Sequence, residues 1–519
     1  MTHVVIVGAG IGGVPAAYAL RAGLGPQDRV SVVSDKDYFH FVPSNPWVAM
    51  GWRGYDEIAF PIAPLLAQRG ISFIRQGLRR VDAELNRLEL ADGSRVDYDY
   101  LVLATGLQGA FGEVRGLGPK AGYTHSVIHI EDAMQAGEAW QAFVRDPGPI
   151  VVGAAQGSAI LGPMYEFAFL ADADLRRRNI RERVPITVVT PEPYPGHLGI
   201  GGQTDTRQLL EAALRERGID CVCNAGTLGV ESGKVHIVEY DQQGREQPPR
   251  ELTFAYAVYW PPFHGIEALR NSPDLADTRG FVRVDEYLRS PECSNIYAVG
   301  ACVARPVREE TAVALGVPES VYSIQGEVDT AVRNILADLD GEPLASAAPR
   351  RAKWLSDMGE TGAAYLAEPN VPLRNINWMK DGKWVHSAKV DFEKYFINKI
   401  KLAPVGRRAP LGSQVASTVC QMESAMRDGR SRPHARRGTA GVLTVPLEQE
   451  RARELDALAT VLGRPADAVA AELLKAAVQD AYACLSGPLL EQVEQARREL
   501  LVAELPEHQP GVEFDSGAP

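Results

Sequence analysis

The sequence is poor in cysteine, in long apolar runs and in positive charge. Six cysteines among 519 residues, with no Cys-x-x-Cys pair, make neither a disulfide framework nor a cysteine-rich metal site, and we expect no bound metal. No apolar run approaches the ~18 residues that a membrane-spanning helix needs. The formal net charge of −12 disfavours nucleic acid as the main partner. A predicted strand begins at residue 3 and leaves no room for a signal peptide, so we expect a cytoplasmic protein.

The first twenty residues predict the opening half of a dinucleotide-binding β-α-β unit. Residues 3–7 have the composition of a buried strand, and residues 14–20 that of a helix. The turn between them is a G-x-G-x-x-G motif. In this motif Gly8 allows the tight turn, Gly10 lets the backbone approach a pyrophosphate, and Gly13 lets helix and strand pack closely. Free N–H groups at the helix N-terminus would bind the phosphates.

The end of the next predicted strand offers polar groups for a ribose. Residues 30–33, with the sequence VSVV, predict the second strand and are followed by Ser34 and Asp35. An acid at this point hydrogen-bonds the ribose in dinucleotide-binding units. Asp35 lies one step beyond the usual place, so Ser34 and Asp35 share the assignment. The alternative is that Asp35 is a turn residue.

A second strand–turn–helix unit begins at residue 149 and lacks the residues of a working nucleotide site. Its turn, residues 153–158, has the sequence GAAQGS. Ala155 replaces the middle glycine and Ser158 the last one, and the partner strand ends at Thr190 with no acid. This pattern predicts a nucleotide-type domain that does not bind NAD(P)H.

Several stretches between residue 1 and about residue 402 match one known family. In chain order they are SDKDYF (34–39), AMGWR (49–53), QG (156–157), GPMYEF (162–167), EPYPGHLG (192–199), GVP (316–318), GKWVH (382–386) and FEKYF (392–396). In these stretches the chain resembles the sulfide:quinone oxidoreductases and the related flavoproteins of flavocytochrome c sulfide dehydrogenase. The resemblance implies an α/β fold with two interleaved Rossmann-like domains of the disulfide-reductase flavoprotein type. It also implies FAD, covalent or not, and quinone reduction at a membrane face.

The resemblance assigns further residues to the site. The strand over residues 100–103 ends in Ala-Thr-Gly, which places Thr105 and Gly106 beside the cofactor, and Gly300 belongs to a late flavin-contacting strand. Glu166 and His197 match polar residues of the family and are our catalytic candidates, as a proton relay and a proton shuttle. The alternatives are an intrahelical pair for Glu166 and a plain surface-loop histidine for His197.

The chain departs from the family where sulfide is oxidised. The family's sulfur-carrying cysteines belong at the positions of Ile128, Ile160 and Trp354, which have no thiol. The family's lysine after Gly-Val-Pro is Glu319 here, which would oppose negative charge on a reduced flavin.

Three other cysteines are candidates to replace the family's sulfur-carrying cysteines. Cys221 and Cys223 alternate along a predicted strand, so their side chains share one face, where small buried apolar residues are the plain interpretation. Cys302 lies two residues after Gly300, and packing beside the cofactor is its plain interpretation.

A stretch near residues 370–402 mixes aromatic and basic side chains, as a membrane-facing surface does. Phe392, Tyr395 and Phe396 fall at i, i+3, i+4 spacing and would share one face of a helix. We therefore expect a peripheral contact with the inner face of the membrane. An ordinary amphipathic helix covering the core is the alternative.

The resemblance stops after residue 402. Residues 403–440 predict a flexible linker, residues 441–505 a small β-α-α module of ribbon-helix-helix type, and residues 506–519 a disordered tail. From residue 441 onward the chain has six Lys or Arg and 14 Asp or Glu. This acidic balance disfavours DNA, so we expect the module to form a homo-oligomer.

Three functions remain open at this point. The leading one is an FAD-dependent oxidoreductase that passes electrons from an unidentified donor to a quinone. The second is a non-catalytic, flavin-binding assembly or regulatory subunit. The third is a true sulfide oxidase that uses a different thiol, Cys302.

Overall fold

The computed structural model describes residues 1–120, 122–201, 204–241, 243–306, 309–317, 319–347, 352–368 and 376–402, with a few isolated positions beyond. The chain divides into two units, Met1–Gly406 and Arg407–Pro519. The predicted linker and tail lie outside the described residues, as does nearly all of the predicted module. Those three assignments stay predictions, and the fold below is that of the first unit.

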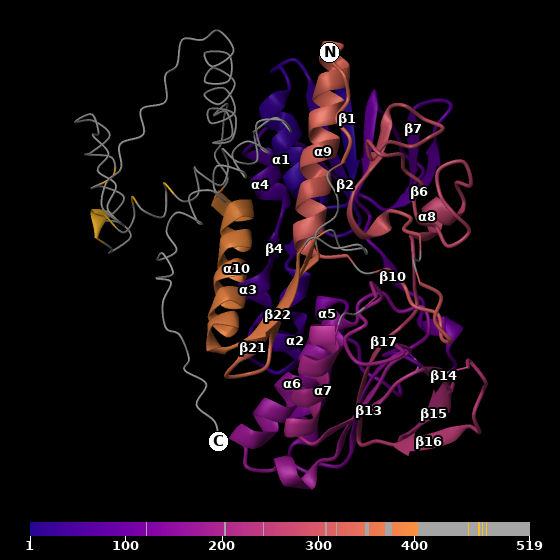
Figure 1. The fold of residues 1–519 in the computed structure, drawn as a ribbon. Helices are drawn as coiled ribbons and strands as arrows, with labels where there is room; N and C mark the ends of the chain where they lie inside the picture. The colour runs from indigo at the N-terminus through magenta and orange to yellow at the C-terminus, as the bar shows by residue number, and fades with distance from the viewer. Residues whose placement is uncertain are drawn as a thin grey trace, which may run out of the picture. The chain divides into compact units, whose positions relative to one another are not determined.

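Five parallel strands form the first sheet, in the order β19-β9-β1-β2-β5. Figure 1 labels two of them, β1 and β2, which lie beside helix α1. Val4 and Ile6 belong to the same core as the buried residues of α1, whereas Val5 and Val7 belong to a core on the opposite face. Both faces are covered, which is why these strands are continuous apolar runs. The elements are β1 (His3–Val7), α1 (Gly13–Gly23), β2 (Arg29–Ser34), β5 (Ser72–Arg75), β9 (Tyr100–Leu103), β19 (Ile296–Ala298) and α9 (Val321–Asp340), which contacts α1.

The opposite face of this sheet packs against an antiparallel three-stranded sheet. Its strands are β6 (Leu78–Asp82), β7 (Arg87–Leu90) and β8 (Arg95–Asp97). Val81 and Leu88 of this sheet share their core with Val5 and Leu101.

The same architecture is repeated in a second sheet, in the order β13-β12-β11-β17, again all parallel. Val152 belongs to the same hydrophobic core as the buried residues of helix α6. Val151 lies on the other face of the sheet, in a core shared with the β14-β15-β16 sheet. The elements are α5 (Ile130–Phe143), β11 (Ile150–Ala154), α6 (Gly162–Arg177), β12 (Ile186–Val189), α7 (Thr204–Glu216), β13 (Ile219–Val222), β14 (Ala225–Glu231), β15 (Lys234–Glu239), β16 (Arg250–Thr253) and β17 (Tyr256–Trp260). The two parallel sheets confirm the predicted α/β class.

Another antiparallel three-stranded sheet precedes helix α10. It consists of β20 (Ala352–Asp357), β21 (Gly362–Glu368) and β22 (Ile376–Asp381), and α10 (Lys383–Leu402) packs against β20 and β21 (Figure 1). The remaining short elements are β3 (Tyr38–His40), α2 (Asn45–Ala49), α3 (Tyr55–Ile58), β4 (Ala59–Pro61), α4 (Ala63–Ala67), β10 (Gln108–Gly109), β18 (Phe263–His264) and α8 (Glu267–Arg270).

Helix α10 shows that one prediction is wrong, namely that Phe392, Tyr395 and Phe396 share one helical face. Phe396 is fully buried and Phe392 partly buried, both against Phe41, whereas Tyr395 is 58% exposed. The core side of the helix is centred near Phe396, so residue 395 turns outward. Among the described residues, no helix combines the length and apolar composition needed to cross a membrane.

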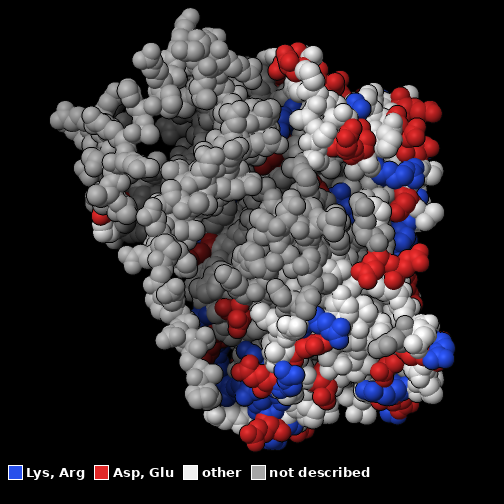
Figure 2. All heavy atoms as spheres, in the orientation of Figure 1, with Lys and Arg blue, Asp and Glu red and all other residues white. Residues whose placement is uncertain are grey.

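Charged side chains of both signs are interspersed over the face of the unit in Figure 2. Exposed ion pairs also occur among the described residues. On α7, for example, Arg207 pairs with Glu211 at 2.8 Å.

Candidate functional site

A cavity of ≈770 Å³ opens at the carboxyl ends of the strands of the first sheet. This is where ligands bind in open α/β sheets, and the volume lies in the range of roughly 300–1,000 Å³ typical of small-molecule sites. The cavity is lined by segments that follow β1, β2, β9 and β19, together with the start of α9 and part of β20. All but one of the predicted cofactor-binding residues line it: Gly8, Gly10, Ser34, Asp35, Thr105, Gly106 and Gly300.

The first glycine turn has the geometry that a pyrophosphate needs. Gly8 has φ +113°, and a Cβ there would lie 2.3 Å from the carbonyl oxygen of Ala104. A Cβ on Gly13, the predicted residue that does not line the cavity, would lie 1.9 Å from the carbonyl oxygen of Gly8, so Gly13 acts through close packing. A Cβ on Gly10 would meet nothing within 4 Å, which leaves this backbone open to a ligand.

The second turn is filled by the protein's own groups. The Gln156 side chain accepts the N–H of Thr227 at 3.0 Å and donates to its carbonyl oxygen at 3.3 Å. The ring of Tyr259 covers Gly153, where a Cβ would lie 2.1 Å from it. At the end of β12 the buried Thr190 hydroxyl donates to Glu192 at 2.7 Å. We therefore keep the prediction that NAD(P)H does not bind at this turn.

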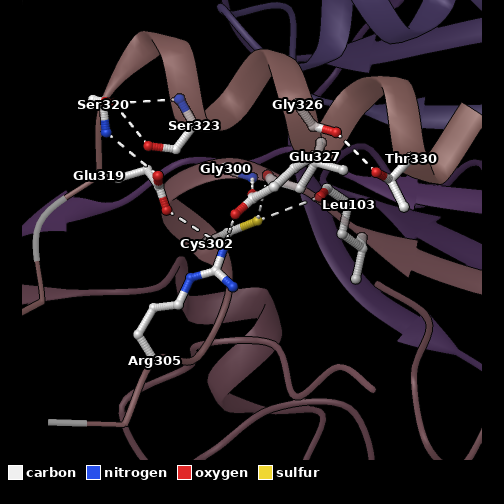
Figure 3. Close-up of polar contacts among 11 residues, drawn as sticks. Leu103, Gly300, Cys302, Arg305, Glu319, Ser320, Ser323, Gly326, Glu327 and Thr330 are labelled. Atoms are coloured by element: carbon white, nitrogen blue, oxygen red, sulfur yellow. Dashed lines mark hydrogen bonds and ion pairs between the residues drawn. The ribbon is translucent and has the colours of Figure 1, made fainter. Parts of the chain in front are cut away.

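The N-terminus of α9 reaches the cavity through Glu319, Ser320 and Val321. Ser320 caps the helix by accepting the N–H of Ser323 at 3.2 Å (Figure 3). Partial positive charge at this helix end faces the cavity.

Arg305 joins this helix to the strand end at Gly300. Its guanidinium lies 3.4 Å from the Glu319 carboxylate and forms an ion pair with Glu327, which accepts the N–H of Gly300 at 2.8 Å (Figure 3). The negative charge of Glu319 is therefore paired with the positive charge of Arg305, and both side chains line the cavity.

Three residues far apart in the sequence line the same cavity. They are Ile128 just before α5, Ile160 just before α6 and Trp354 on β20. The Trp354 ring packs against Tyr365, with centroids 5.3 Å apart. Their side chains are apolar and present no thiol to the cavity.

Glu166 on α6 forms a buried ion pair with Lys389 on α10, and both residues line the cavity. Burial raises the pKa of Glu166 to about 7, against the opposing charge of Lys389. The Lys389 ammonium also lies 4.7 Å from the Trp47 ring. A carboxyl group titrating near neutral pH at a cavity wall is suited to proton transfer.

Further polar groups lead from this pair toward the surface. The indole N–H of Trp47 donates to Asp357 at 2.8 Å, and His386 Nδ1 lies 3.0 Å from the same carboxylate. The Asp357 side chain is fully buried, whereas that of His386 is 39% exposed. His386 therefore lies between the buried Asp357 carboxylate and solvent.

Two candidates from the sequence are not brought to the cavity. His197 is buried in the loop after β12, with Nε2 3.1 Å from the Glu309 carboxylate, and it does not line this cavity. The Cys302 thiol is fully buried on the opposite face of the first sheet and donates to the Leu103 carbonyl oxygen at 3.3 Å (Figure 3). Burial raises its pKa, so it is a packed thiol rather than a reactive one.

Sequence reasoning missed Lys389, Arg305 and Glu327. For Lys389 a signal was available. Val385, Lys389 and Glu393 are buried at steps of four residues along α10, and Phe396 and Ile400 continue that face. A lysine on an apolar helical stripe marks a buried, paired charge.

Comparisons with known proteins agree with this geometry. The family model described as "Pyridine nucleotide-disulphide oxidoreductase" matches residues 2–323. The sulfide-quinone reductase of Aquifex aeolicus is 35% identical over 401 residues, which covers 77% of this chain and 91% of the relative. The chain belongs to the sulfide:quinone oxidoreductase family.

Structural and more distant matches agree with that family. The crystal structure of the Aquifex aeolicus sulfide:quinone oxidoreductase superposes with a TM-score of 0.74 at 33% identity, covering 83% of this chain and 96% of that one. The mitochondrial sulfide:quinone oxidoreductase of Mus musculus is 23% identical and covers 60% of this chain and 67% of its own length.

The chain is thus an FAD-dependent oxidoreductase of the sulfide:quinone oxidoreductase family. The residues of the first cavity fit this cofactor. The open backbone at Gly10 and the N-terminus of α1 would hold the pyrophosphate, and Ser34 and Asp35 would hold the ribose.

Proposed function

We propose that this protein is a quinone reductase that takes its electrons from a donor other than sulfide. One observation supports the choice of donor. The cavity positions at which the family resemblance calls for sulfur-carrying cysteines hold Ile128, Ile160 and Trp354. A thiolate is required to accept sulfane sulfur, and none of these side chains has one. Slow direct attack of sulfide on the cofactor remains compatible with this proposal.

The quinone half of the reaction needs two electrons and two protons for each quinol formed. Bound FAD would supply the electron pair. Glu166 would supply a proton, since its pKa of about 7 leaves much of it protonated at neutral pH. Lys389, which pairs with it, would hold the carboxylate that remains. Asp357 and His386 would pass a proton from solvent back to Glu166, which would then supply the second proton of the quinol.

Aromatic side chains on the same cavity wall suit a quinone ring. Phe392 of α10 stacks on Tyr322 of α9 with centroids 4.7 Å apart, and both line the cavity. A flat apolar surface beside a proton donor is what a quinone head group requires.

The outer face of α10 would contact the membrane that supplies the quinone. Trp384 and Tyr395 are 50% and 58% exposed, and Lys383, Lys394 and Lys399 are exposed on the same helix. Exposed aromatic rings with lysines favour a head-group interface. For the module at residues 441–505 we propose self-association, because modules of ribbon-helix-helix type dimerise or bind DNA and its acidic balance disfavours DNA.

Steady-state quinone reduction with decylubiquinone and a panel of donors tests the proposal. We expect turnover with at least one donor, and only slow reaction with sulfide. If no donor supports turnover and photoreduced enzyme fails to react with decylubiquinone, the protein is instead a non-catalytic flavin-binding subunit.

A further inference from the structure

A second cavity, of ≈510 Å³, lies at the free edge of the second sheet. Edge strand β13, helix α7 and the loop after β12 line it, and it shares no lining residue with the first cavity. Cys221 and Cys223 both line it and are both partly buried. The two thiols therefore meet a space that a small molecule can enter.

The geometry of the two thiols is close to that of a disulfide. Their sulfur atoms lie 3.7 Å apart. Cys221 lies on β13, and Cys223 directly follows the last residue of that strand, Val222. The Cα atoms of extended residues two apart are separated by about 6.6 Å, within the range of roughly 4.4–6.8 Å that disulfides span. Bond formation needs a side-chain rotation and a local backbone adjustment that brings the two Cβ atoms within about 4.5 Å of each other.

The surroundings of the pair disfavour a thiolate at Cys221. Its hydrogen bond with Cys223, its burial and the nearby Glu192 and Glu211 all raise the pKa of the Cys221 thiol. The raised pKa slows attack by Cys221 itself, because the thiolate is the nucleophile. At equilibrium, a dithiol that is not stabilised by ionisation is oxidised more readily, the reverse of the strongly oxidising DsbA.

We propose that Cys221 and Cys223 form a dithiol–disulfide site that exchanges with low-molecular-weight disulfides entering this second cavity. The cavity would hold one half of such a disulfide beside the Tyr194 ring, which Arg207 covers at 4.9 Å. This chemistry is separate from the flavin reaction.

The exchange takes place in two balanced steps. One cysteine loses its proton and attacks a sulfur of the disulfide RSSR, which forms a mixed disulfide and releases RS⁻, protonated to RSH. The second cysteine then attacks the protein sulfur of the mixed disulfide, forms the Cys221–Cys223 bond and releases a second RSH. The dithiol is oxidised by two electrons, RSSR is reduced to two RSH, and the two thiol protons leave with the products.

Thiol trapping on the full-length protein tests this site. The protein is incubated anaerobically with oxidised glutathione, quenched in acid, alkylated and analysed by peptide mass spectrometry. We expect the peptide with both cysteines to lose its two alkylatable thiols and two hydrogen atoms, without retained glutathione. In glutathione buffers the pair should titrate as one two-electron couple, with a tenfold change in ratio for each 29.6 mV.

Single variants identify the two steps. Cys221→Ser and Cys223→Ser should each stop at the mixed disulfide, so glutathione stays on the remaining cysteine. Cys293, in the same protein samples, reports the behaviour of a single thiol. The proposal is overturned if the wild-type peptide keeps both free thiols in excess oxidised glutathione, or if it retains glutathione as the single variants do.

Discussion

The two strand–turn–helix units of this protein have the same architecture and different turns. In the first, β1 ends at Val7 and α1 begins at Gly13, and the backbone at Gly10 is open to the cavity. In the second, β11 ends at Ala154 and α6 begins only at Gly162, and Gln156 fastens the turn to β14. A nucleotide site thus depends on the few residues of a turn and not on the sheet beneath it.

The second unit serves the first cavity instead of forming its own. The N–H of Gly157 donates to the Ala314 carbonyl oxygen at 2.7 Å, and the N–H of Gly316 donates to that of Ser158 at 3.0 Å. These bonds hold the turn against the loop before α9, and Ile160 then lines the cavity that Glu166 also reaches. The first unit would hold the cofactor, and the second supplies part of the cavity lining and an acid.

The largest effect, on FAD binding, is expected when a glutamate is introduced into the first turn and, in a separate variant, into the second. Gly10→Glu should abolish FAD binding, because the new side chain enters open space where a pyrophosphate would lie and repels it. The matched change Gln156→Glu keeps an oxygen that can accept the Thr227 N–H, and this variant should purify with stoichiometric flavin. Absorbance spectra and FAD content of both proteins make the comparison. Equal flavin loss in both variants would contradict the division of roles.

Loss of the Glu166 acid should slow quinone reduction by roughly 10²–10⁴-fold, the usual contribution of general acid catalysis. Glu166→Gln alone leaves the Lys389 charge buried without this carboxylate, at a cost of about 3–5 kcal/mol in folding stability. Glu166→Gln with Lys389→Met removes both charges and serves as the stability control.

The pH profile separates catalysis from stability for this pair. Protonated Glu166 is the active form, so the wild-type rate should fall as pH rises through about 7. The Glu166→Gln variant should lack that step. A profile that keeps the step in the variant would assign it to another group.

Thiols restored on the cavity wall should give a smaller, positive effect. Ile160→Cys with Trp354→Cys should raise sulfide-dependent quinone reduction from below ~1 s⁻¹ toward the range of ordinary enzymes, ~1–10³ s⁻¹. Glu319 limits the gain in part, since its carboxylate stays at the cavity. Wild-type turnover of sulfide within that range would refute the proposed donor, and its loss in Cys302→Ala would restore the thiol hypothesis.

The smallest expected effect is none at all. NADH and NADPH should leave the flavin spectrum unchanged, because Gln156 and Tyr259 fill the second turn. Stopped-flow absorbance after anaerobic mixing measures this. Bleaching within milliseconds would show that the second unit binds a nicotinamide nucleotide.

Much of the fold could be predicted from local sequence. The glycine motif, the apolar strands and the strand ends at Ser34 and Thr105 are local signals, and the structure brings these residues to one cavity. The presence of Ile128, Ile160 and Trp354 at one cavity could be expected only from the family resemblance, because no local pattern relates residues this far apart.

What could not be predicted depends on long-range packing. Arg305 reaches Glu327 across the start of α9, and no spacing in the sequence indicates that ion pair. His197 matches a family motif, but its loop folds away from the first cavity, next to Thr206 of α7. The outward position of Tyr395 depends on which side of α10 meets the core, and the spacing alone wrongly placed Tyr395 on one face with Phe392 and Phe396.

Anaerobic stopped-flow absorbance tests the central claim most directly. The flavin of the full-length protein is reduced photochemically and mixed with decylubiquinone, and oxidised protein is mixed in parallel with sulfide. We predict rapid reoxidation by decylubiquinone and slow or absent bleaching by sulfide. Rapid bleaching by sulfide, or reduced flavin that persists in excess decylubiquinone, would contradict the account.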